Sequence, residues 1–325
     1  MLANNEDIIT AVEKIRRIEE KIREISSVLR KQKEFILNVK PFSLEKLKVI
    51  GVDGSIVSKR CYGLDLALIS AMAAIFEYCS GKLVKTKFYP SPPFKKLVTY
   101  TQPILEDKLS LSLSYHRQLT ELKVAYNVLK NEKPDFLILD GSLYLKENLL
   151  ESFPKYSEIY NLFIKICEIC KNRGIYLVGV VKDSRCAKFV QDIAKVTGEK
   201  LNIRDVSLLY NLLREGERTT TFKLNPSQNI LSFYLKVSEY DKPLRVDFLA
   251  VDGDSQLACT VASVIYFLSS FNKTFGYPAV LLEADARVRL SKDDIEAVYY
   301  ELLKKLGGAS TLLLSLKRED KLLLC

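Results

Sequence analysis

Histidine is almost absent from this chain of 325 residues, because His116 is the only one. Catalytic zinc sites depend on histidine ligands, so the sequence excludes chemistry that is built on several histidines. Sites made of carboxylate oxygens stay open, and these ligands suit hard cations such as Mg²⁺ and Mn²⁺.

Hydrophobic runs long enough to cross a bilayer are also missing. The longest runs, residues 64–76 and 257–268, fall short of the roughly 20 residues that a membrane-spanning helix needs. The first residues include acids and lack the pattern of a signal peptide. We therefore expect a cytoplasmic protein with no membrane partner.

Cysteine is present but shows no metal-binding pattern. Seven cysteines without a secretion signal favour reduced, mostly buried thiols. Cys167 and Cys170 form a CxxC pair inside a helical pattern, where positions three apart share one face. No second pair stands at short spacing, so both are expected to pack as small hydrophobic residues rather than to bind zinc.

Positive charge is in excess, with 49 Lys and Arg against 40 Asp and Glu, which gives a net charge of +9. This balance favours a polyanionic partner such as nucleic acid, although many basic proteins are metabolic enzymes.

The order of the predicted elements argues for an α/β fold with a mixed sheet. Residues 5–38 have the spacing of a long amphipathic helix, which either packs back onto the domain or pairs with a second subunit. Predicted strands then follow one another before they alternate with helices. Since no linker rich in Gly or Ser occurs, we expect an N-terminal helical arm over residues 1–42 and one domain over residues 43–325.

The segment 90–103 contains four prolines and is predicted to be an irregular loop. Its Phe94, Lys95, Lys96 and Tyr100 offer a stacking and phosphate-binding surface for single strands, although an ordinary long loop explains them equally well. The other predicted elements that bear on the site are strands over 47–53, 135–140, 175–181, 279–285 and 310–316, and helices over 112–131 and 291–306.

One short phrase occurs twice, as VIGVDGS at residues 49–55 and as LILDGS at residues 137–142. Each is an apolar, β-branched run that ends in an aspartate and is followed by Gly and Ser. A strand that delivers a carboxylate to the end of a sheet and then turns on Gly is typical of metal-dependent phosphoryl-transfer sites. Asp53 and Asp140 can share a metal if their strands are neighbours. Alternatively, each aspartate bonds to its own backbone in a turn.

Glu121 lies in a predicted helix, on a face with Ala125 and Val128. A carboxylate within an apolar stripe is costly unless it is paired or bound to a metal. It either joins the metal site of Asp140 or pairs with Arg117, four residues before it.

Five further positions follow predicted strands or lie in them. Lys182 follows the strand YLVGVV and either stabilises charge on a phosphate or is simply solvated. In a strand over 279–285, Glu283 and Asp285 would point to one face, at a metal-bound edge or at a solvent-facing one. Asp247 and Asp252 are weaker candidates, because they occur late in the chain.

Two or three carboxylates that converge on hard cations suit a two-metal scheme. One ion activates water for attack on a phosphodiester, and the other stabilises the leaving oxygen. Mn²⁺ or Mg²⁺ fits such oxygen ligands, and a basic surface would hold the remaining nucleic-acid backbone.

An ordered set of phrases resembles the NurA family. The set is VDGS, a helix with Glu, LILDGSL, VVKDSR, LREGERT, LRVDF, and GYP followed by LLEAD, and it covers roughly residues 45–305. The resemblance implies a ribonuclease H-like mixed sheet flanked by helices. It also implies a Mn²⁺-dependent single-strand endonuclease and 5′-to-3′ exonuclease that acts in DNA end resection. Members are homodimers that dock on the HerA hexameric ATPase.

The resemblance also assigns residues. Asp53 and Asp140 match the metal-binding aspartates, Glu121 matches the helical glutamate, and Lys182 and Tyr277 fall in the VVKDSR and GYP phrases. The sequence departs from the family at Asp285, where members commonly carry histidine. An aspartate can bind a metal but offers no neutral nitrogen ligand, so metal preference and activity depend on this position.

Two other interpretations stay open. A non-catalytic DNA-binding partner of the ATPase would have lost its chemistry at Asp285. An actin-like kinase also opens on a strand, an aspartate and a glycine, but such a kinase needs a glycine-rich adenosine pocket, and this chain has 13 glycines with one Gly-Gly pair.

Overall fold

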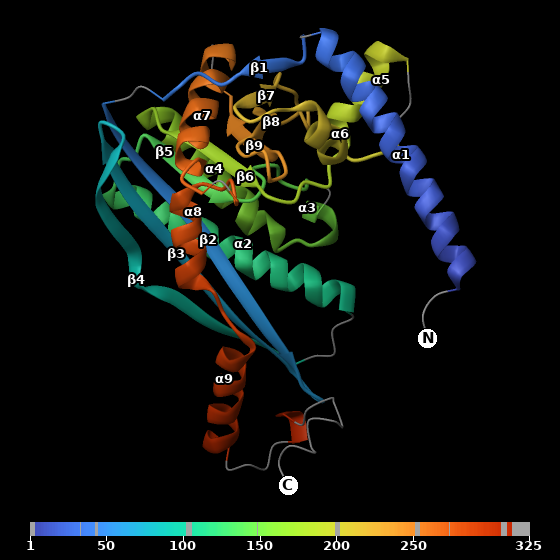
Figure 1. Cartoon of the computed structure of the whole chain (residues 1–325). Coiled ribbons are helices and arrows are strands. Elements are labelled where there is room, and N and C mark those ends of the chain that lie inside the picture. The colour runs from blue at the N-terminus through green and yellow to red at the C-terminus, as the bar shows by residue number, and fades with distance from the viewer. Residues whose placement is uncertain are drawn as a thin grey trace. The chain divides into compact units, whose positions relative to one another are not determined.

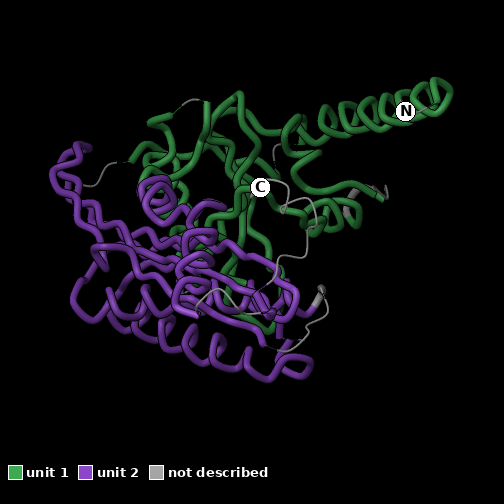
Figure 2. Tube along the Cα trace, turned by 90° about the horizontal axis from the view of Figure 1, so that it is seen from below, with its two compact units in different colours: residues 1–43, 141–144, 178–279 green, residues 44–140, 145–177, 280–325 purple. Residues whose placement is uncertain are grey.

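The computed structural model describes residues 4–32, 34–42, 45–101, 106–147, 149–198, 202–250, 254–272, 274–306 and 311–313. The chain divides into two compact units (Figure 2). Unit 1 comprises residues 1–43, 141–144 and 178–279, and unit 2 comprises residues 44–140, 145–177 and 280–325.

Figure 1 shows the helices and strands. The strands are β1 (Ile36–Asn38), β2 (Lys46–Arg60), β3 (Asp65–Cys79), β4 (Lys82–Tyr100), β5 (Phe136–Asp140), β6 (Tyr176–Val181), β7 (Glu217–Thr219), β8 (Ile230–Lys236) and β9 (Leu244–Leu249). The helices are α1 (Asn5–Gln32), α2 (Glu106–Asn131), α3 (Leu149–Ser152), α4 (Tyr156–Arg173), α5 (Lys188–Thr197), α6 (Asp205–Leu212), α7 (Asp254–Ser269), α8 (Ala279–Val288), α9 (Lys292–Lys305) and the 3₁₀ turn η1 (Thr311–Leu313).

The sheet of unit 2 has the strand order β5-β2-β3-β4. β2, β3 and β4 pair antiparallel, and β5 pairs with β2 in parallel. β3 reads as an almost continuous apolar run, and most of its residues are buried. Strands covered on both faces lose the alternation of polar and apolar residues, which explains this run.

The proline-rich segment that was predicted as a loop is part of a strand. β4 continues through Pro90, Pro92 and Pro93 to Tyr100 and is the edge strand of the sheet, although its pairing with β3 shifts between Ala71 and Ala73. Proline lacks a backbone N–H donor and is therefore tolerated in edge strands and bulges. The loop prediction is wrong because it treated proline as a strand breaker regardless of position in the sheet.

The segment predicted as a strand over 279–285 is the helix α8. Its buried residues Val280, Leu281, Ala284 and Val288 have helical spacing. Short apolar runs are ambiguous between strand and helix, and Ala, Leu, Glu and Arg all favour helix here. The strand predicted over 310–316 is also wrong where the structure describes it, because residues 311–313 form η1. The rest of that range lies outside the described residues.

Unit 1 has the strand order β1-β7-β8-β9-β6, and its pairings from β6 through β9 and β8 to β7 and β1 are antiparallel. Parallel and antiparallel pairs therefore both occur in the chain. The predicted α/β class, a mixed sheet flanked by helices, is confirmed.

The N-terminal helix was predicted to run to residue 38, but α1 ends at Gln32 and residues 36–38 form β1. Only its C-terminal half packs into unit 1. Ile22, Ile25 and Leu29 join a buried cluster with residues of α5 and α6. In Figure 2 the N-terminal half of this helix extends away from the remainder of unit 1. Its apolar residues there are exposed: Ile8, Ile9, Val12, Ile15 and Ile18.

Among the described helices, none combines the length and the hydropathy that crossing a membrane requires.

Candidate active site

The two repeated aspartates lie side by side in the sheet of unit 2. β2 and β5 are parallel neighbours, and Val52 pairs with Leu139. Asp53 and Asp140 each follow those paired residues, so they share a level in strands that lie about 4.8 Å apart. Residues at one level of neighbouring strands project to the same face, so the two carboxylates project from the same side of the sheet.

That side faces α8. Gly51 and Ser55 lie two residues before and after Asp53, so they project from the same face of β2. Gly51 contacts α8, and Ser55 contacts the segment that follows it. A Cβ on Gly51 would lie 2.9 Å from Val280 Cγ1, and Ser55 Oγ accepts a hydrogen bond from Leu290 N at 3.1 Å. Side chains two apart in a strand share a face, so Asp53 also points toward α8.

The two glycines of the repeated phrase have different structural roles. β2 was predicted to end at Asp53, but it continues without a turn to Arg60. Gly54 is required by a close contact, because a Cβ there would lie 2.7 Å from Cγ and from Oε1 of Glu121. Gly141 does turn the chain, with a φ of 114° that side chains rarely adopt.

Glu121 interacts electrostatically with Asp53 and Asp140. It comes from α2, is 8% exposed, and its side chain lies against the backbone of Gly54. The pKa of its carboxyl is raised to about 8, mainly by burial; the charge of Arg117 opposes this rise, and the charges of Asp53 and Asp140 add to it. The charges of Asp53 and Asp140 thus disfavour the ionisation of Glu121.

Arg117 is the cation next to this group. Its Nη1 donates to Glu121 Oε1 at 2.6 Å. The charge of Glu121 and then those of Asp53 and Asp140 raise its pKa, although burial opposes them. The alternative prediction of an Arg117–Glu121 pair is therefore confirmed, but the pair lies within the carboxylate group instead of apart from it.

The chemistry of these donors fits a hard cation. Asp53, Glu121 and Asp140 offer only oxygen, and their mutual repulsion favours a divalent ion between them. Across the described ranges, no three His, Cys, Asp or Glu side chains are gathered closely enough to hold a metal ion. Glu121 is held by Arg117 here, so metal binding would require it to exchange that partner.

Asp285 lies on α8 and not in a strand. Its Oδ2 accepts from Arg289 Nη2 at 2.6 Å, and Glu283 pairs in the same way with Arg287. The prediction that Glu283 and Asp285 share a face is wrong, because residues two apart on a helix point in different directions. Asp285 is half-buried and follows the buried Ala284 on the helix that packs against Gly51.

Lys182 and Tyr277 come together in unit 1. Lys182 follows the last residue of β6, and its Nζ lies 4.2 Å from the centroid of the Tyr277 ring. Tyr277 is buried and donates its hydroxyl to Val180 O at 3.3 Å. Tyr277 thus holds Lys182 by a cation–π contact at the end of a strand.

Asp247, a weaker candidate from the sequence, has a defined structural role. Asp247 on β9 is fully buried and accepts hydrogen bonds from Arg245, Ser232 and the turn that follows Asp140. The signal in the sequence was the spacing of Arg245 and Asp247, whose side chains share a face of a strand. Asp252 lies outside the described residues.

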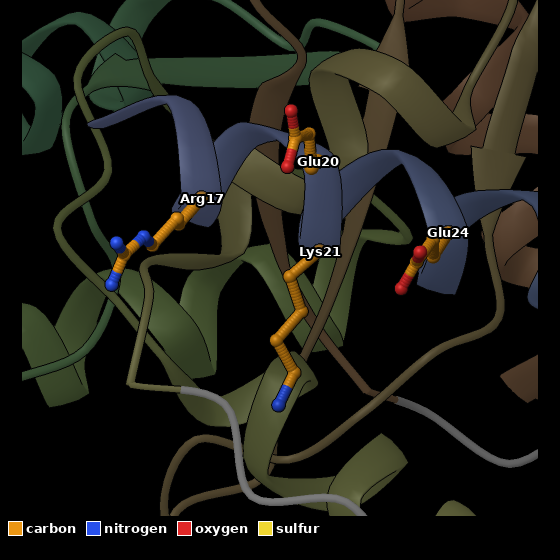
Figure 3. A pocket seen from close by; sticks show the side chains of 4 residues that line it. All are labelled: Arg17, Glu20, Lys21 and Glu24. Atoms are coloured by element: carbon orange, nitrogen blue, oxygen red, sulfur yellow. The ribbon is translucent and has the colours of Figure 1, made fainter. Parts of the chain in front are cut away.

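Two other features of the molecule carry no site. Cys167 and Cys170 pack in α4, where burial raises the pKa of each thiol to about 12. Figure 3 shows a hollow beside α1 that is lined by Arg17, Glu20, Lys21 and Glu24. These lining side chains come from successive turns of one helix and have opposite charges. The hollow therefore does not bring together residues from distant parts of the chain.

Comparison with solved structures shows a shared fold. The chain is similar to the NurA nuclease from Sulfolobus solfataricus, at 18% identity and a TM-score of 0.61, over 94% of this chain and 98% of that one. It is also similar to a NurA bound to dAMP and manganese, at 12% identity and a TM-score of 0.56, over 93% and 97% of the two chains. No curated protein matches. The model of the NurA domain matches residues 47–290, and the chain therefore belongs to the NurA family of nucleases.

Proposed function

We propose that this chain is a Mn²⁺-dependent DNA nuclease, for which Mg²⁺ is a possible substitute. In this proposal it cuts single strands internally and digests DNA 5′ to 3′ in cytoplasmic end resection, together with a HerA-type hexameric ATPase. The observation that carries the proposal is the common level of Asp53 and Asp140 on neighbouring parallel strands. Glu121, whose carboxyl interacts electrostatically with both aspartates, adds a third carboxylate.

Each residue has a proposed role. Asp53, Glu121, Asp140 and Asp285 hold the metal, which when bound supplies Lewis acidity and an activated water. Asp53 and Asp140 orient the site from the rigid sheet. Arg117 balances the charge of Glu121 and stays near to contact the phosphate backbone once Glu121 turns to the metal.

Lys182 and Tyr277 are proposed to act together. The cation–π contact holds the ammonium of Lys182 over a ring that is itself fixed by its bond to Val180 O. A positioned ammonium of this kind stabilises negative charge on a scissile phosphate. Tyr277 would then set the orientation of Lys182.

Two observations support a nucleic acid as the substrate. A NurA of the same fold has been solved with dAMP and manganese. This chain has a net charge of +9, which favours binding to a polyanion.

The direct test is the release of nucleotides from an end-labelled single strand with Mn²⁺, Mg²⁺ or a chelator. Asp53→Asn and Asp140→Asn should reduce cleavage to background, while Asp293→Asn on the exposed start of α9 should cleave as wild type does. Cleavage that survives chelator, or that persists in Asp53→Asn, would contradict the proposal.

A non-catalytic DNA-binding partner of the ATPase is the second candidate. It is favoured by the ion pair between Asp285 and Arg289, at the position where the family commonly carries histidine. In that case the wild-type chain binds DNA without cleaving it under any divalent ion. Asp285→His would then gain cleavage, whereas a nuclease would already be active before the substitution.

Homodimer formation and docking on the ATPase are part of the same proposal. Co-sedimentation of the chain with a HerA-type ATPase tests the docking. A chain that sediments alone at micromolar concentration would contradict it.

A further inference from the structure

The carboxylate of Asp247 is completely buried, at 0% exposure, in unit 1. A buried charge is costly unless other groups form hydrogen bonds or ion pairs with it, so the partners of Asp247 indicate its structural role. Arg245 neutralises it with two hydrogen bonds, from Nε to Oδ1 at 3.0 Å and from Nη2 to Oδ2 at 3.1 Å. Ser232 on β8 donates to Oδ1 at 2.7 Å.

The remaining partners come from the turn directly after Asp140. Ser142 Oγ donates to Asp247 Oδ2 at 2.7 Å, and Leu143 N donates to the same oxygen at 3.3 Å. Ser142 Oγ also accepts from Tyr144 N at 3.1 Å. One carboxylate oxygen therefore holds two consecutive residues of this turn.

The turn has little freedom elsewhere. Gly141 has a φ of 114° and donates its N–H to Val180 O at 2.8 Å. A Cβ on Gly179 would lie 2.5 Å from Gly141 O, so the backbone passes closer than a side chain would allow. The turn from Gly141 to Tyr144 is thus held by backbone contacts on one side and by Asp247 on the other.

We infer that Asp247 is a positioning residue: by holding the turn Gly141–Tyr144, it fixes the direction in which the chain leaves Asp140 and so orients that carboxylate for the metal. A buried apolar residue would pack this strand without fixing a turn. The carboxylate is suited to the task because it accepts hydrogen bonds from several directions. The inference rests on the proposed function, since it concerns the same metal.

Ser142→Ala and Ser232→Ala form a matched pair that tests this role. Each removes one hydroxyl that donates to Asp247 at 2.7 Å, but only Ser142 belongs to the turn after Asp140. Neither leaves Asp247 without Arg245. Binding of Mn²⁺ alone is measured by titration with electron paramagnetic resonance detection of the free ion, and thermal unfolding is recorded in parallel.

Ser142→Ala should weaken Mn²⁺ binding by about 10-fold or more, as is usual when support for a metal ligand is lost, while Ser232→Ala should leave it unchanged. Asp247→Asn should weaken it at least as much as Ser142→Ala. Cleavage at saturating Mn²⁺ should recover in Ser142→Ala, since the metal ligands themselves are intact.

Equal Mn²⁺ affinity in the two serine variants would overturn the inference, because a purely structural network would respond alike to both. That result with an active wild-type chain defeats the inference alone. A wild-type chain that neither binds Mn²⁺ nor cleaves DNA defeats the proposed function and, with it, the role of Asp247.

Discussion

A Cβ on Gly54 would lie 2.7 Å from Cγ and from Oε1 of Glu121, so the glutamate occupies the space that any side chain at position 54 would need. The contact joins the strand that carries Asp53 to the helix that carries Glu121. Because the two residues lie 67 positions apart in the chain, from 121 − 54, only folding brings them together.

Gly54→Ala is expected to push Glu121 away from the sheet. The clash should destabilise the protein by about 1–3 kcal/mol, as overpacking of a filled site does, and should weaken Mn²⁺ binding. Urea unfolding and metal titration measure the two effects. The double variant Gly54→Ala/Glu121→Ala provides the control, because removing the glutamate side chain also removes the clash. If the second substitution relieves none of the destabilisation, the contact is not its cause.

The pKa of Glu121 predicts how stability without metal depends on pH. Its folded value of about 8 lies above the ordinary 4.5, so the folded state holds the proton more tightly than the unfolded chain. The stabilisation is therefore complete below about pH 4.5 and is lost as the pH rises through about 8. Urea unfolding with chelator at pH 5 and pH 8.5 should show lower stability at the higher pH.

Glu121→Gln is the control for this pH dependence, since the amide cannot ionise. Its loss of stability between the two pH values should be clearly smaller than that of wild type. Saturating Mn²⁺ should reduce the loss in wild type, because a bound cation favours the ionised carboxylate. Equal pH profiles for wild type and Glu121→Gln would show that another group is responsible.

Shortening a side chain to Ala should have different effects on stability in the two halves of α1. Leu29 is 0% exposed in the cluster formed with α5 and α6, and Ile15 is 56% exposed. Leu29→Ala should lower the free energy of unfolding by about 2–5 kcal/mol, whereas Ile15→Ala should change it little in the monomer. Chemical unfolding at low protein concentration distinguishes the two. Comparable losses would mean that the N-terminal half is also packed.

The exposed stripe on α1 is a candidate contact of the proposed homodimer. Ile8, Val12 and Ile15 recur at helical spacing on one face and leave apolar surface in water. Val12→Asp/Ile15→Asp should shift sedimentation equilibrium from dimer toward monomer. Arg17→Asp introduces the same side chain on the opposite face and should leave the dimer intact. A dimer that persists in Val12→Asp/Ile15→Asp would have its interface elsewhere.

Much of the site could be predicted from the repeated phrase. The repeated apolar run followed by Asp-Gly-Ser predicted that Asp53 and Asp140 would lie together, and their strands are parallel neighbours, although β2 continues past Asp53 to Arg60. Glu121 followed from its place in an apolar stripe of a helix. The need for Gly54 could not be predicted, because its reason is a side chain from another element.

Two elements were predicted wrongly because their local sequence patterns are compatible with more than one structure. The prolines of β4 suggested a loop, but an edge strand has no need of their missing N–H groups. The short apolar run around Ala284 fits a strand or a helix, and burial against the sheet decided for the helix α8. The family membership expected from the ordered phrases is confirmed over residues 47–290.

By itself, the sequence determined which residues are candidates for chemistry, that carboxylate oxygen and not histidine is available to a metal, and the mixed α/β class. These follow from composition and from periodicities along the chain, which are local properties. Only the tertiary structure decided that Asp53 and Asp140 stand at one level, that Arg117 lies among the carboxylates, and that Asp247 holds the turn after Asp140. Those relationships depend on strand register and on burial, which arise when distant segments pack and expel water from between them.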